Sequence, residues 1–65
     1  MIDPAKLEIT IRAECEWLSA QADQYNNYGK TAKSSAERTF FLGRRDDYNV
    51  SLAMLEQILW DAAKD

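Results

Sequence analysis

Five basic residues in one short segment give the sequence its clearest capacity to bind a ligand. Residues 29–45 contain five Lys or Arg and one acid, Glu37, so the segment carries a net charge of +4. Guanidinium and ammonium groups bind phosphate and carboxylate, and Arg near tyrosine rings can hold a stacked base. The candidate residues for an anion or an acidic partner are Tyr25, Tyr28, Lys30, Lys33, Arg38, Arg44 and Arg45.

The same segment has a simpler interpretation as a solvated surface. Its basic groups would then pair with acids of the same chain or of a second copy, and exposed pairs contribute only about 0–1 kcal/mol each. On a helix, Arg44 and Asp47 are three residues apart and are expected to pair locally. We favour this interpretation over a site for an anion, a nucleotide or an acidic partner. A whole-chain net charge of −3 argues against nucleic acid as the main partner.

The sequence offers little for catalysis or metal binding. It contains no histidine, the commonest general base, and its single cysteine, Cys15, falls on an apolar stripe that suits a small buried side chain. Glu14 and Asp61 fall near the expected seam between helices, which is far short of a di-iron carboxylate set. We find no Gly-rich phosphate loop. We therefore expect no catalytic residue, no metal, no cofactor and no enzyme activity.

Length sets a second expectation, that the chain self-associates. The 65 residues form one domain, 1–65, and a chain of this size buries only about 60% of its unfolded surface. Small domains compensate with disulfides, metals or oligomerisation. A lone cysteine cannot form an internal disulfide and zinc needs several Cys or His ligands, so oligomerisation remains.

The expected location is the cytoplasm. One free thiol fits a reducing compartment, and the first residues, Met-Ile-Asp-Pro, lack the basic and apolar segments of a signal peptide. No stretch approaches the roughly 18 apolar residues that a transmembrane helix needs. We expect no membrane association.

The first helix is predicted over residues 4–28. Asp3 can accept the exposed amides of the first turn, Pro4 suits the first helical position, and Ile2 and Leu7 have the spacing of a hydrophobic staple. Gly29 suits a left-handed residue after the helix. The apolar stripe of this helix is Leu7, Ile11, Cys15, Leu18, Ala22 and Tyr25, and a weaker opposite stripe contains Ile2, Ile9, Ala13, Trp17 and Ala20.

The second helix is predicted over residues 35–63. Ser34 and Glu37 match a capping box at its start. A break at residues 43–47 would instead give a three-helix bundle, with Gly43 ending one helix and Asp46 capping the next. The apolar phase continues across this stretch, so we favour one long antiparallel helix with Gly43 as a point of close approach.

The second helix has more apolar surface than one neighbour can cover. One stripe contains Ala36, Phe40, Val50, Met54 and Ile58, and a second contains Phe41, Tyr48, Leu52, Leu55 and Leu59. Either stripe could face the first helix, and the other would then be exposed. The predicted assembly is a homodimeric four-helix bundle, because a twofold dimer packs the spare stripes together. The residues assigned to the oligomer interface are Phe41, Tyr48, Leu52, Leu55, Leu59, Trp60 and Trp17.

The segment Gly43-Arg-Arg-Asp-Asp-Tyr48, followed by Leu52, Leu55 and Ile58, resembles the second helix of short helical-hairpin proteins of phages and prophages. The likeness covers about a third of the chain, from Phe41 onward. It implies an accessory or regulatory protein that acts by binding, and it carries over no site residue. The expected function is thus protein–protein binding by a small oligomer. The alternatives are sequestration of an anionic metabolite or nucleotide, and a nucleic-acid accessory role.

Overall fold

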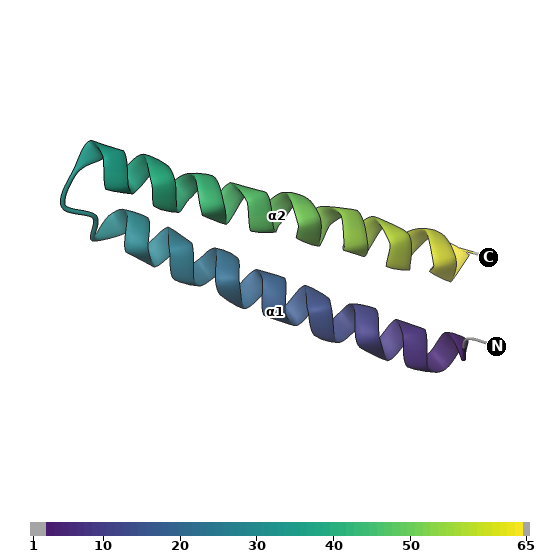
Figure 1. Cartoon of the computed structure of the whole chain (residues 1–65). Coiled ribbons are helices and arrows are strands. Elements are labelled where there is room, and N and C mark those ends of the chain that lie inside the picture. Colours follow the sequence, from purple (N-terminus) through teal and green to yellow (C-terminus); the bar gives the residue numbers. More distant parts are fainter. Residues whose placement is uncertain (1–2, 65) are drawn as a thin grey trace.

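The computed structural model describes residues 3–64 as a hairpin of two long helices. Helix α1 (Pro4–Lys30) and helix α2 (Ser35–Lys64) lie side by side and antiparallel, with both chain ends at the same end of the hairpin (Figure 1). The described residues contain no strand, and their principal extents are 49 × 17 × 15 Å. The predicted all-α helical hairpin is confirmed, and α1 runs two residues beyond its predicted end at residue 28.

Both helices begin as their local sequence predicts. The Asp3 carboxylate accepts the Ala5 N–H at 2.9 Å, with Pro4 in the first turn. At the start of α2, Ser34 Oγ accepts the Glu37 N–H at 3.1 Å, and the Glu37 carboxylate accepts the Lys33 N–H at 3.3 Å. Such caps satisfy amides that have no partner inside the helix. The predicted staple with Leu7 involves Ile2, which lies outside the described residues.

The prediction that Gly29 adopts a left-handed conformation after α1 is wrong. Gly29 is helical and buried, no described glycine has a positive φ, and α1 ends at Lys30. Thr31 caps the helix by donating its N–H to the Asn27 carbonyl at 3.2 Å. Gly29 is needed for packing instead, because a Cβ atom there would lie 2.5 Å from Cδ2 of Leu42.

Helix α2 is continuous through residues 43–47, so the three-helix alternative is wrong. The helical phase of its apolar residues is maintained across this stretch, which removes any need for a break. The close approach expected at Gly43 is also wrong, since a Cβ atom there would meet nothing within 4 Å. The close contact between the helices falls at Gly29.

The core of a single chain is small. Only Leu18 and Ala22 are buried hydrophobic residues, at 6% and 4% exposure, among the residues described. The α2 stripe that faces α1 is half-buried, whereas Phe40 and Met54 of the other stripe remain 61% and 63% exposed. The half-buried apolar residues that line the seam are Ile11, Cys15, Tyr25, Phe41, Leu42, Tyr48, Leu52, Leu55 and Leu59.

Candidate functional site

The buried Leu18 divides the surface of α1 into two flanks. Successive residues of an α-helix are about 100° apart, so Trp17 and Ser19 project to opposite sides of the line on which Leu18 meets α2. Trp17 is 50% exposed. Asn26 is seven residues after Ser19. Seven residues make almost two full turns of an α-helix, so Asn26 lies on the same flank as Ser19.

Two contacts assign the residues of α2 to the same flanks. The Arg45 guanidinium donates to Asn26 Oδ1 at 2.8 Å, so Arg45 lies on the Ser19 flank. Arg44, one residue earlier, lies on the Trp17 flank, where its guanidinium carbon is 5.8 Å from the centre of the Tyr25 ring. By the same phase Ile58 falls on the Trp17 flank and Trp60 on the other.

An unbroken series of aromatic contacts crosses the seam in the half of the hairpin near the turn. Tyr48 meets Trp17 edge-on at 5.7 Å between ring centres and stacks on Tyr25 at 5.6 Å. The ring centre of Tyr25 also lies 5.6 Å from that of Tyr28. The ring centre of Phe41 lies 5.5 Å from that of Tyr28 and 5.6 Å from that of Phe40. We call the surface that carries the exposed members of this series the aromatic flank, and its large side chains are Trp17, Tyr28, Phe40, Arg44 and Ile58.

Arg44 lies over this aromatic series without a carboxylate partner. Its guanidinium carbon is 5.5 Å from the centre of the Tyr48 ring, and Nη2 donates to the Tyr48 hydroxyl at 3.3 Å. That hydrogen bond, helped by Tyr25, raises the pKa of Arg44 above its ordinary value. The predicted local pair with Asp47 does not form. Among residues 3–64 no acid lies within ion-pair distance of Arg44.

Arg45 has a different environment, although it adjoins Arg44 in sequence. It forms an ion pair with Asp46 at 2.8 Å and holds Asn26 across the seam. The structure therefore brings Tyr25, Tyr28 and Arg44 together and places Arg45 on the opposite flank. The other predicted residues of the basic site lie exposed around the turn, without an ion pair to the acids of the described chain: Lys30, Lys33 and Arg38.

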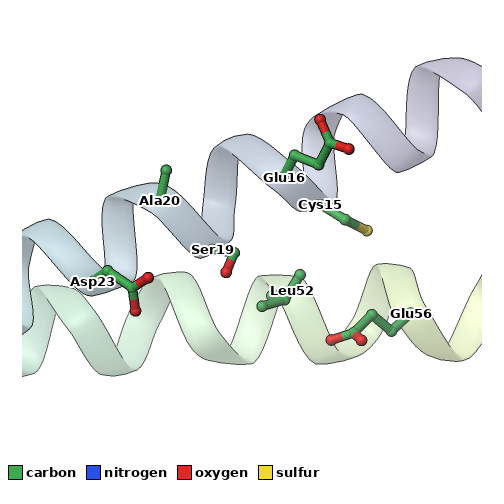
Figure 2. A pocket seen from close by; sticks show the side chains of 7 residues that line it. All are labelled: Cys15, Glu16, Ser19, Ala20, Asp23, Leu52 and Glu56. Carbon is green, nitrogen blue, oxygen red and sulfur yellow. The ribbon is translucent and has the colours of Figure 1, made fainter.

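The flank opposite Trp17 is polar. A shallow hollow there has Cys15 and Leu52 pointing into the space between the helices, while Glu16 points away from α2 (Figure 2). Within residues 3–64, no three potential ligand side chains are grouped closely enough to hold a metal ion. The lining residues of the hollow are Cys15, Glu16, Ser19, Ala20, Asp23, Leu52 and Glu56. We call this surface the polar flank.

A second, mainly apolar pocket of about 330 Å³ lies at the open end of the hairpin. The helices move apart toward this end (Figure 1), and Leu7 remains 47% exposed as a result. The pocket is lined by Pro4, Leu7, Glu8, Ile11, Arg12, Ile58, Leu59, Ala62 and Ala63.

The residues assigned to an oligomer interface fall into two groups. Trp17 and Trp60 are exposed, on opposite flanks, and Trp60 has the Lys64 ammonium 5.1 Å from its ring centre. The other five line the seam between α1 and α2 of one chain, so the stripe that stays exposed is the alternative one. These five are Phe41, Tyr48, Leu52, Leu55 and Leu59.

Sequence reasoning did not identify the hydrogen bond between Asn26 and Arg45 or the approach of Gly29 to Leu42, because both depend on how the helices are rotated against each other. Comparison with protein-family models, with curated proteins and with solved structures found no match. Neither helix has a stretch that is long and apolar enough to cross a membrane within the part of the chain described.

Proposed function

We propose that this chain works as a homodimeric four-helix bundle that acts by binding another protein, as an accessory or regulatory factor and not as an enzyme. The observation that carries the proposal is the surface area. One chain exposes 5201 Å², whereas a compact monomer of 7.5 kDa exposes about 4,200 Å². The excess, about 1,000 Å², is close to the roughly 800 Å² that each partner contributes to a standard interface.

The small core supports the same assembly. Leu18 and Ala22 alone are buried apolar side chains among the described residues, while Phe40, Met54 and Ile58 are all more than half exposed. Fully burying one such large side chain contributes about 1.5–3 kcal/mol. A second hairpin can cover several of them at once, which makes association and folding one linked process.

The basic turn supports a role in binding. Lys30, Lys33 and Arg38 are exposed and lack an acidic partner in the described part of the chain, at the end of the hairpin farthest from both chain ends. Such a cluster attracts acidic surfaces and speeds encounter with them. We therefore assign the turn to an acidic partner protein.

Two measurements test this function. Sedimentation of the wild-type chain should show a dimer at micromolar concentration, and a compact monomer would contradict the proposal. For the partner, the chain is used as bait in an extract of the native cell and compared with Lys33→Glu/Arg38→Glu. A matched control, Lys6→Glu/Lys64→Glu, reverses two charges at the open end. The wild type and the control should recover the same protein, and the turn variant should not.

Arg44 supports a second candidate function, retention of a small anion such as a nucleotide. The observation that favours it is a guanidinium lying over Tyr25 and Tyr48 without a carboxylate among residues 3–64. Within the described chain its guanidinium forms one hydrogen bond, from Nη2 to the Tyr48 hydroxyl, so its other N–H groups can donate to phosphate. Calorimetric titration with a nucleoside diphosphate tests this candidate.

A further inference from the structure

The two flanks of the hairpin differ enough to identify which one meets the second copy. We infer that the dimer forms through the aromatic flank, with the two hairpins packed so that their turns lie at opposite ends. This inference rests on the proposed dimer and adds its face and its orientation.

The aromatic flank has the composition of a buried interface. Trp17, Tyr28, Phe40 and Ile58 are 50%, 42%, 61% and 51% exposed. Aromatic residues and Arg are enriched at interface centres, and an apolar surface of this extent is unusual on a soluble monomer. The helical phase of Leu59 places Ser51 and Ala62 on the same flank, where small side chains allow close approach. The phases of Leu18 and Leu59 also place two exposed carboxylates there, Glu14 and Asp47.

The polar flank has the composition of a solvated surface. It carries the exposed ion pair between Arg12 and Glu8, at 2.8 Å, and the ion pair of Arg45 with Asp46. Its hollow also contains Glu16, Asp23 and Glu56, and no basic side chain. Packing two copies through this flank would bring like charges together and remove them from water, which is costly.

Charge complementarity sets the orientation of the two copies. The turn segment, residues 29–45, carries +4, although its Arg45 lies on the polar flank in an ion pair with Asp46. The open end, residues 3–16 and 50–64, has six acids and three bases and so carries −3. With the turns at opposite ends, the basic turn of each copy lies near the acidic open end of the other. By helical phase Lys30 and Arg38 fall on the polar flank, so they stay available to the acidic partner protein. With both turns at one end, two basic segments would lie side by side and repel.

The two tryptophans provide a matched pair of variants for the face. Trp17→Glu alters the aromatic flank, and Trp60→Glu places the same charge at a similarly exposed tryptophan on the polar flank. In sedimentation, Trp17→Glu should raise the dissociation constant of the dimer by at least about tenfold, as expected for a large side chain at an interface centre. Trp60→Glu should leave it unchanged. Equal effects of the two variants would overturn the choice of face.

Milder variants keep the test valid if Trp17→Glu fails to fold. The chain has two tryptophans, so Trp60→Phe leaves Trp17 as its single tryptophan fluorophore and Trp17→Phe leaves Trp60. Quenching by iodide should weaken for Trp17 as protein concentration rises through the dimer range, and it should stay constant for Trp60. The reverse pattern would place the second copy on the polar flank.

A distance measurement tests the orientation. Ser35 begins α2 beside the turn, so a nitroxide label on Ser35→Cys, in a Cys15→Ser background, reports the separation of the two turns. A 30-residue helix is about 45 Å long, so turns at opposite ends should place the labels about 40 Å apart or more. A separation of about 20 Å or less would overturn the orientation.

The outcomes of these experiments distinguish a failure of the inferred face or orientation from a failure of the proposed dimer. A wild-type chain that sediments as a monomer contradicts the dimer itself. A dimer that persists in Trp17→Glu, or that gives a short label distance, contradicts the face or the orientation and leaves the dimer standing.

Discussion

Gly29 of α1 lies directly against Leu42 of α2, so closely that a Cβ atom on Gly29 would be 2.5 Å from Leu42 Cδ2 and 3.0 Å from Cγ. Ordinary carbon–carbon contact is about 3.5–4.0 Å. The absence of a side chain at this position therefore lets the helices meet next to the turn. Gly43, the other glycine, has open space where its Cβ would be.

The two glycines are expected to respond in opposite directions to alanine. Gly29→Ala should lower the free energy of unfolding by about 1 kcal/mol, because overpacking exceeds the gain in helix propensity. Gly43→Ala should raise it by about 0.5–1 kcal/mol, since an exposed helical position gains propensity without a clash. Urea denaturation at one fixed protein concentration measures both. Stabilisation by both substitutions would show that Leu42 moves aside without cost.

Leu52 and Val50 test which stripe of α2 holds the hairpin together. Leu52 is half-buried and lines the space between the helices, whereas Val50 is 60% exposed. Leu52→Ala should lower the free energy of unfolding by about 2 kcal/mol, near the low end for core leucines because it is only half-buried. Val50→Ala should change it by about 0.5 kcal/mol or less. Thermal melts with both chains at equal concentration give the comparison, and a larger loss at Val50 would contradict the packing.

The hydrogen bond between Arg45 and Asn26 is expected to couple the helices across the seam. A double-mutant cycle with Arg45→Met and Asn26→Ala should give an interaction energy of about 0.5–1.5 kcal/mol. Asp46→Ala serves as the control, because it removes the neighbouring ion pair and leaves the bond across the seam in place. Strictly additive effects of the two substitutions would indicate that this bond contributes nothing.

The different surroundings of the adjacent arginines lead to a prediction about ligand binding. If the chain holds a small anion, Arg44→Gln should abolish the binding of a nucleoside diphosphate in calorimetry, because Arg44 lies over Tyr25 and Tyr48 and has no acidic partner among residues 3–64. Arg45→Gln should leave binding intact, since Arg45 is already bonded to Asp46 and Asn26. Added salt should weaken wild-type binding. Binding that survives Arg44→Gln would remove Arg44 as the anion site.

The features that depend on neighbouring residues in sequence could be predicted from it. Asp3 and Ser34 cap the helices through groups two or three residues away, so the chain pattern contains all the needed information. The continuity of α2 likewise follows from the spacing of its apolar residues, which keeps the same helical phase across residues 43–47. These features gave the fold class before any contact between the helices was known.

The rotation of α2 against α1 could not be predicted, because it depends on contacts between residues far apart in sequence. Both apolar stripes of α2 have helical spacing, so either of them could have faced α1. The structure turns Phe41 and Tyr48 toward Tyr25, and this leaves Phe40 outside. The same rotation separates Arg44 from Arg45, which one residue of helix places about 100° apart. A basic cluster that is continuous in sequence is therefore divided between two surfaces.

The position of both chain ends at one end of the hairpin has a mechanical consequence (Figure 1). A force that pulls the start of α1 away from the end of α2 acts first on the contacts between the helices at the open end. It reaches the contact between Gly29 and Leu42 last. Contacts then break one after another, so each step opposes the force with only a few side chains. On refolding, the short loop beside the turn closes at the least entropic cost, and pairing extends from there toward the ends.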